Sequence, residues 1–212
     1  ILAVKGRVLP VTLEDVNIVA ELENGEKVTG ESKIAPVVLK TKSRINKIHL
    51  QPENVEPYED VISALGSADL IVIGPGSLYT SIIPNLLTDR VSEAVAKSKA
   101  KKMYIANVMT QEGETDGLNI ADHVKAILNH CNDRKIVDLV IVNKEKIPDY
   151  LIQKYAKQNS ESLYLTKDQR NELEKMKIKI IEGNFLKFNG EYVRHNEEKL
   201  AKVIIDNYNY LF

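Results

Sequence analysis

The sequence predicts an α/β protein with a doubly wound, mostly parallel sheet, and two observations support that prediction. The first is a short apolar run rich in β-branched residues, Asp69–Ile73, which ends abruptly at Gly74-Pro75-Gly76. Such a run is too short for a helix and indicates a strand buried on both faces, as in a parallel sheet covered by helices. The second is the alternation of helical and strand-like segments from residue 57 onward, which indicates βαβ crossovers.

Before residue 57 the pattern is antiparallel instead. Residues 8–12 suggest a short extended segment, and Asn24-Gly25 between two strand-like runs is a strong hairpin signal. We expect this ribbon to continue to Ile48–Leu50. The basic stretch Lys40–Lys47 is interpreted as a mobile connection, either a solvated loop or a segment that steers an anionic ligand. This hairpin excursion covers about residues 16–50 of a predicted single domain, residues 1–212.

The alternating part yields a series of predicted elements. Helices are expected at 58–64, 85–100, 119–131, 148–157 and 168–176, and strands at 69–73, 103–108, 137–143, 163–165 and 178–181. A turn at Asn189-Gly190 and a terminal helix capped by Asn196 complete the chain. Residues 1–6 resemble the end of a helix that began earlier, and the first residue is not Met, so we expect an upstream segment.

Composition excludes several classes of protein. A hydrophobic content of 43% can fill a core, and a net charge of -1 with interspersed signs argues against nucleic-acid binding. The single cysteine, Cys131, excludes an internal disulfide and favours an intracellular setting. No apolar run approaches the length needed to span a membrane.

The loop from Gly74 to Ser81 is the strongest candidate site. It follows a predicted strand and precedes a predicted helix, with Ser81 as the expected N-cap and Pro84 in the first turn. Exposed amides and the helix dipole favour phosphate at such a place. The alternative is an ordinary strand-to-helix turn, because the loop lacks both the lysine of a Walker loop and the third glycine of a dinucleotide fingerprint.

A second polar loop follows the next strand. Asn107 ends that strand, and residues 110–117 could supply oxygen ligands to a bound molecule or to a divalent cation. The alternative is a solvated connection. His123, on the first turn of the following helix, is a candidate contact, whereas His130 is interpreted as structural or at the surface. No zinc or hydrolase motif is present, so no metal site is predicted.

The candidate residues therefore gather at the ends of two strands. The predicted ligand-binding residues are Gly74, Pro75, Gly76, Ser77, Thr80, Ser81, Asn107, Thr110, Gln111, Glu114, Thr115 and His123. No catalytic residue is assigned, and Glu114 and Asp116 are the only nearby carboxylates that could act as a base.

Five segments resemble the bacterial gluconeogenesis factor family, the YvcK-like proteins: Val4–Thr12, Gly74–Leu87, Asn107–Thr115, Asp122–Val124 and Val193–His195. That family is similar to the CofD-like group, whose namesake, 2-phospho-L-lactate transferase, makes part of a deazaflavin coenzyme. The resemblance implies a Rossmann-like fold, a cytoplasmic location and binding of a UDP-sugar such as UDP-N-acetylglucosamine, with no required cofactor. It also implies a role in cell shape and wall synthesis during gluconeogenic growth. We further expect a homo-oligomer, a dimer.

The sequence departs from the family pattern at its start. A Gly-Gly-Gly-Thr-Gly loop and an Asp-Asp-Gly-Gly-Ser-Ser-Gly segment of the family do not occur here. Much of the nucleotide pocket is therefore expected upstream, with residues 74–81 and 107–115 as its other wall. Residues 1–212 alone are accordingly expected to be poorly soluble and not to bind UDP-sugars. A transferase like the namesake, and a scaffold with a vestigial pocket, are the alternative functions.

Overall fold

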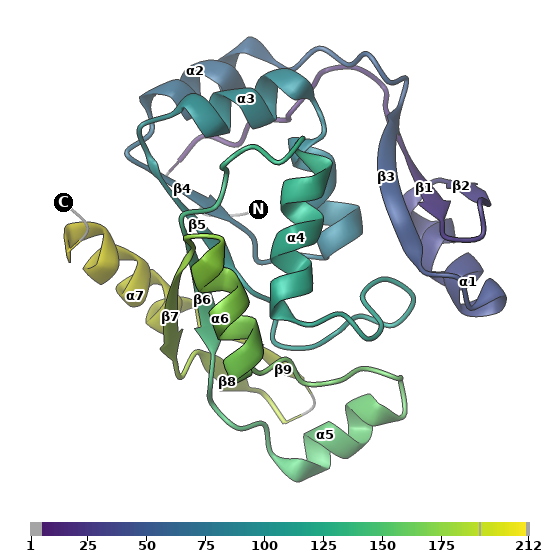
Figure 1. Ribbon diagram of the computed structural model, residues 1–212, viewed down its shortest axis with the longest axis vertical. Coiled ribbons are helices and arrows are strands. Elements are labelled where there is room, and N and C mark those ends of the chain that lie inside the picture. Colours follow the sequence, from purple (N-terminus) through teal and green to yellow (C-terminus); the bar gives the residue numbers. More distant parts are fainter. Residues whose placement is uncertain (1–5, 191, 211–212) are drawn as a thin grey trace.

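A four-stranded parallel sheet forms the centre of the molecule (Figure 1). The computed structural model describes residues 6–190 and 192–210, so residues 1–5, on which the prediction of a preceding helix largely rests, lie outside the described residues. The strand order is β4-β5-β6-β7. The bounds are β4 (Leu70–Ile73), β5 (Lys101–Ile105), β6 (Leu139–Asn143) and β7 (Lys179–Gly183). The helices of this part are α2 (Glu59–Ser67), α3 (Asp89–Lys97), α4 (Ile120–His130), α5 (Asp149–Ala156) and α6 (Lys167–Lys175).

Alternate residues of the strands pack on opposite faces of this sheet, as period-2 geometry requires. Tyr104 and Val140 join the large core cluster that contains Val124 and Ile127 of α4. Met103, Ile105, Leu139 and Ile141 instead belong to a second cluster, together with Leu200 of α7 (Glu197–Tyr210). Both faces are therefore covered by helices, and the predicted α/β class with a parallel sheet is confirmed.

The antiparallel excursion is a three-stranded sheet of order β2-β1-β3. It consists of β1 (Asn17–Leu22), β2 (Lys27–Thr29) and β3 (Ile45–Gln51). The predicted hairpin is confirmed, with Gly25 at φ +85° in its turn. The continuation to residues 48–50 is also confirmed, since Ile18 pairs with Leu50.

The basic connection of this excursion was predicted wrongly. Helix α1 (Glu31–Thr41) includes Lys40, and Lys47 lies in β3. Ile34 and Val38, four residues apart, are buried on one side of α1 and join the main core cluster. Burial of this stripe stabilises the helix although Pro36 lies inside it and removes one backbone hydrogen bond.

One short predicted strand is also wrong, because residues 163–165 form no strand and an isolated bridge joins Met109 to the preceding Ser162. Residues 8–12, the expected extended segment, contain no helix or paired strand. The chain instead has a second hairpin around the predicted turn, with strands β8 (Leu186–Phe188) and β9 (Val193–His195). Asn196 caps the following helix as predicted, because its Oδ1 accepts from the Lys199 amide at 2.9 Å.

The segment after β4 is divided into three helical pieces where one helix was predicted. A π-helical turn, η1 (Leu78–Ile82), is followed by a 3-10 turn, η2 (Ile83–Leu86), and then by α3. The N-cap is Ser77 rather than Ser81, because the amides of Ser81 and Ile82 both donate to the Ser77 carbonyl, at 3.0 and 2.9 Å. Pro84 lies in the first turn of η2, where its missing N–H has no intrahelical acceptor to lose.

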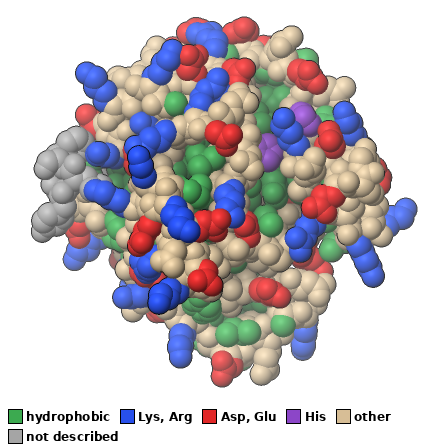
Figure 2. Space-filling model, in the orientation of Figure 1, with side chains coloured by type: hydrophobic (Ala, Val, Ile, Leu, Met, Phe, Trp, Pro, Cys, Tyr) green, Lys and Arg blue, Asp and Glu red, His purple; other side chains and the backbone are tan. Residues whose placement is uncertain are grey.

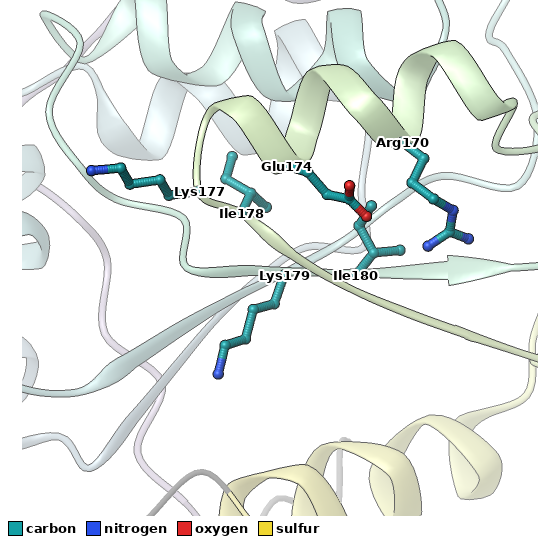
Figure 3. Close-up of a pocket in the computed structure, with 6 residues that line it drawn as sticks. All are labelled: Arg170, Glu174, Lys177, Ile178, Lys179 and Ile180. Atoms are coloured by element: carbon teal, nitrogen blue, oxygen red, sulfur yellow. The ribbon is translucent and has the colours of Figure 1, made fainter.

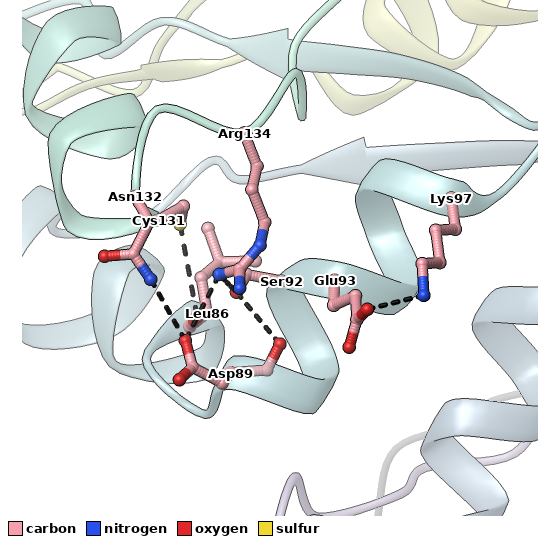
Figure 4. Close-up of polar contacts among 8 residues, drawn as sticks. All are labelled: Leu86, Asp89, Ser92, Glu93, Lys97, Cys131, Asn132 and Arg134. Atoms are coloured by element: carbon pink, nitrogen blue, oxygen red, sulfur yellow. Dashed lines mark hydrogen bonds and ion pairs between the residues drawn. The ribbon is translucent and has the colours of Figure 1, made fainter.

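Polar contacts hold the start of α3 against the turn that follows α4 (Figure 4). Asp89 Oδ1 accepts from Asn132 Nδ2 at 3.1 Å and from Arg134 Nη1 at 3.2 Å. The same Arg134 nitrogen donates to Ser92 Oγ at 2.9 Å. These contacts fix the bend between η2 and α3, and they lie away from the candidate loops.

Acidic and basic side chains are interspersed over the face shown in Figure 2, as the composition predicts. In the part of the chain that the structure describes, no helix combines the length and apolar character needed to cross a bilayer.

Candidate functional site

The loops that follow β4 and β5 meet at the carboxyl end of the sheet, because these two parallel strands are neighbours. Asn107 Nδ2 donates to the Gly76 carbonyl at 3.0 Å. Ser77 Oγ donates to Gln111 Oε1 at 2.7 Å, and Thr80 Oγ1 donates to Glu114 Oε1 at 3.0 Å. The structure therefore joins, through side-chain hydrogen bonds, the two candidate loops that were expected to form one wall of a pocket.

Gln111 links the two loops through its side-chain amide. Its Oε1 accepts from Ser77, and its Nε2 donates to Glu114 Oε1 at 2.7 Å. Ser77 and Gln111 are half-buried, whereas Glu114 is only 7% exposed. The amide thus lies between a hydroxyl donor and a buried carboxyl acceptor.

Three other predicted residues serve the scaffold of the second loop. Thr115 Oγ1 accepts from the Gln111 amide at 2.8 Å, and Asp116 Oδ2 accepts from the Gly113 amide at 2.7 Å. Thr110 Oγ1 accepts from the Glu161 amide at 2.8 Å. With Glu114 and Thr115 buried, this loop is a packed element and not the solvated connection that was the alternative.

Burial raises the pKa of the Glu114 carboxyl, while the Thr80 hydroxyl and the backbone amides of Tyr79 and Thr80 act to lower it. Those amides belong to the first turn of η1, whose N–H groups have no intrahelical acceptors. The helix N-terminus that was predicted to attract phosphate therefore faces a carboxyl group of its own chain. Ser81 is exposed, and its carbonyl accepts from Asn85 Nδ2 at 2.6 Å.

His123, near the start of α4, is fully buried at 0% exposure. Its Nδ1 lies 3.3 Å from the hydroxyl of Tyr104. This partner was not predicted, because Tyr104 lies between the apolar residues Met103 and Ile105 in its strand. Burial lowers the pKa of His123 to about 4, so the ring is neutral at pH 7. His130 has a structural role, since its Nε2 accepts from the Ile48 amide at 2.9 Å and its Nδ1 lies 2.6 Å from the Ala126 carbonyl.

Three of the predicted ligand-binding residues have a buried polar atom without a hydrogen-bond partner. Among the described residues, seven buried side-chain polar atoms have no partner, and three of them are Asn107 Oδ1, Glu114 Oε2 and His123 Nε2. Buried polar groups are normally paired, with protein or with another molecule. A bound ligand or an ordered water molecule would supply these three atoms with partners.

Two hollows lie elsewhere, and none of the predicted ligand-binding residues lines either of them. One, of about 450 Å³, lies beside β7 and the end of α6 (Figure 3) and is lined by Arg170, Glu174 and Lys177–Ile180. The other, of about 600 Å³, lies between β3 and the start of α3. Within the described ranges, no group of three His, Cys, Asp or Glu side chains is placed to hold a metal ion.

Comparisons with known proteins connect this chain to a family. The pattern of the family described as 2-phospho-L-lactate transferase CofD matches residues 1–186. The chain is 40% identical to the gluconeogenesis factor of Bacillus subtilis, over 97% of this chain and 62% of that protein. It is 39% identical to the gluconeogenesis factor of Listeria innocua, over 97% and 60%.

A solved structure agrees with these relatives. The crystal structure of a UPF0052 family member from Bacillus halodurans superposes with a TM-score of 0.88 at 40% identity. The match covers 95% of this chain and 63% of that one. Among the relatives compared, the chain spans as little as 44% and at most 62% of the curated protein's length.

Proposed function

Because the chain belongs to the CofD family, we propose that it is a gluconeogenesis factor that binds a nucleotide sugar, a UDP-sugar, on the loops 74–81 and 107–116. One observation supports this proposal above the others. The loops after two neighbouring parallel strands are joined through side chains and leave two buried polar atoms, Asn107 Oδ1 and Glu114 Oε2, without partners. Ligands of open α/β sheets bind at the carboxyl ends of the strands.

The proposal needs no separate cofactor. A divalent cation would have to be shared with the phosphates of the ligand, because the described side chains offer no three-residue cluster for it. We also propose a homodimer in the bacterial cytoplasm with a role in cell shape and wall synthesis. A buried single cysteine, Cys131, is compatible with a reducing compartment. Light scattering would test the dimer.

Two glycines of the first loop provide a sharp test. A Cβ on Gly76 would lie 3.4 Å from Ser81 Cβ and 3.6 Å from Ile82 Cγ1, which is ordinary contact, and its φ is not positive. Gly76→Ala should therefore keep the melting temperature of the wild type. We expect affinity for UDP-N-acetylglucosamine to fall by more than about tenfold, because the new methyl group keeps a ligand away from the backbone.

Gly74→Ala is the matched control. Gly74 has φ +81°, and its Cβ would lie 3.3 Å from the Ile105 carbonyl oxygen, so this change should lower stability. Calorimetry and thermal melting on both variants separate a binding effect from a folding effect. Wild-type affinity in Gly76→Ala would show that this glycine serves the turn alone.

A transferase like the family namesake is the second candidate, and one observation favours it. The Glu114 carboxyl is buried, has a raised pKa and leaves Oε2 without a partner, features that also occur in general bases. Asp116, in contrast, holds the loop through the Gly113 amide and is the weaker candidate for a base.

We expect the wild-type protein to release no UDP from UDP-N-acetylglucosamine over hours, with or without acceptors, as followed by chromatography. Release that Glu114→Gln abolishes at unchanged ligand affinity would establish a transferase instead. Asp116→Asn should mainly loosen the loop, and its melting temperature reports that. Absence of binding by any UDP-sugar would favour a scaffold with a vestigial pocket.

A further inference from the structure

The side-chain amide of Gln111 fills the space between Ser77 and Glu114. It receives one hydrogen bond, from Ser77 Oγ at 2.7 Å, and gives one, to Glu114 Oε1 at 2.7 Å. Ser77 and Gln111 are half-buried, so both are accessible to solvent, while Glu114 lies below them. A flexible side chain that is accessible from solvent can be displaced by a molecule that offers the same two hydrogen bonds.

The loops 74–81 and 107–116 form one wall of the proposed site, and the side-chain hydroxyl donors of Ser77 and Thr80 in this wall already have acceptors. The Ser77 hydroxyl donates to Gln111, and the Thr80 hydroxyl donates to Glu114. On the two loops, the atoms left without partners are both acceptors, Asn107 Oδ1 and Glu114 Oε2. The phosphates that link the two halves of a UDP-sugar carry acceptors alone at neutral pH, so they cannot donate to either atom. The wall is therefore built for a group that has a donor beside an acceptor.

We propose that the Gln111 amide stands in the place of an amide-like edge of the ligand, an N–H next to a carbonyl oxygen. The N–H of that edge donates to Glu114, and its oxygen accepts from Ser77. This inference rests on the proposed function for the location of the ligand, and it assigns this wall to a part of the ligand other than the phosphates. The imide of uracil presents an N–H beside a carbonyl oxygen on one edge. The acetamido group of an N-acetylated sugar carries the same two groups, but its trans amide points them in opposite directions.

Glu114 gives the wall its selectivity in this proposal. A carboxylate accepts from N–H groups, and it disfavours anions through like-charge repulsion, which combines an attractive and a repulsive element in one residue. Thr80 Oγ1 donates to the same carboxyl oxygen as Gln111, Oε1, and so holds that carboxyl in place. Ser77 and Glu114 are thus the two residues that bind the amide-like edge of the ligand, and the Gln111 side chain is the one that the ligand displaces.

Titration calorimetry on the full-length protein tests the proposal with five probes: uridine, N-acetylglucosamine, UDP, UDP-N-acetylglucosamine and inorganic diphosphate. Ser77→Ala and Glu114→Gln should each weaken binding of UDP-N-acetylglucosamine by about 10- to 100-fold, because the first removes a hydrogen-bond donor and the second replaces a carboxyl acceptor with a weaker amide oxygen. Neither should weaken binding of diphosphate. Gln111→Ala removes the internal competitor and should tighten binding.

The separate probes identify the source of the edge. Ser77-dependent binding of uridine assigns the wall to the base, and Ser77-dependent binding of N-acetylglucosamine assigns it to the sugar. Gln153→Ala, an exposed glutamine on α5, is the matched control and should leave every affinity unchanged. Thermal melting of each variant checks that the fold is kept.

Two results would overturn the inference. One is a loss of diphosphate affinity in Ser77→Ala or Glu114→Gln that equals the loss for UDP-N-acetylglucosamine. The other is wild-type affinity for UDP-N-acetylglucosamine in all three variants, which would leave the proposed function intact. Failure of the wild-type protein to bind any of the five probes would instead overturn the proposed function, and this inference with it.

Discussion

Gly113→Ala should lower the free energy of unfolding by about 2–5 kcal/mol, combining a left-handed backbone conformation with overpacking. Gly113 has φ +77°, and a Cβ there would lie 2.8 Å from the Cα, Cβ and carbonyl oxygen of Ala35 in α1. Backbone atoms of a helix cannot move aside cheaply, so either α1 or the loop that contains Glu114 must shift. Urea denaturation followed by circular dichroism measures the loss.

Gly117→Ala in the same loop is the control for this prediction. Gly117 also has a positive φ, +69°, but its Cβ would meet the tip of a flexible side chain, Arg44 Nη2 at 2.8 Å. We expect this variant to lose about 1–2 kcal/mol, the backbone contribution alone. Equal losses in the two variants would mean that the approach of α1 to the loop adds nothing to the strain.

Lowering the pH from about 6.5 to 4 should remove about 3 kcal/mol of stability through His123. Burial lowers the pKa of His123 in the folded protein from 6.5 to about 4. The unfolded chain therefore takes up a proton below pH 6.5 that the folded protein resists. This contribution is fully present above pH 6.5, is lost as the pH falls, and changes no further below about pH 4.

Comparison with His123→Gln isolates this contribution. Burial also lowers the pKa of His130 and of His195, so the wild-type protein should lose additional stability over the same range. The difference between wild type and His123→Gln, measured by urea denaturation at several pH values, removes those shared contributions. Parallel curves for the two proteins would show that His123 takes up its proton in the folded state without penalty.

Local signals in the sequence predicted part of this molecule correctly. The Asn24-Gly25 hairpin and the helix that begins after Asn119 each carry their own chemistry. Asn119 accepts from the Asp122 amide, and Asp122 accepts from the Asn119 amide, each at 3.1 Å, a capping box encoded within four residues. Such elements depend on neighbours in the chain and can therefore be predicted from one sequence.

Other features depend on packing that no local pattern encodes. Helix α1 was not predicted: Pro36 is unusual inside a helix, and the stability of α1 comes from burial of Ile34 and Val38 against the rest of the core. The N-cap at Ser81 was wrong because Pro84 is compatible with more than one helix start. The hydrogen bond from Ser77 to Gln111 joins residues that are 34 positions apart, and it exists only because β4 and β5 are adjacent in the sheet.

The π-helical turn η1 has an implication for how this segment evolved. A π turn contains one residue more than the α-helical turn that it replaces, and such turns occur frequently at functional sites. Here the extra residue lies within Leu78–Ile82, directly after Ser77. Deleting one residue would restore an α-helical path and rotate Ser77 by about 100° relative to the following segment. A single-residue gap at this place in an aligned relative would therefore mark a protein that has lost the contact between its two loops.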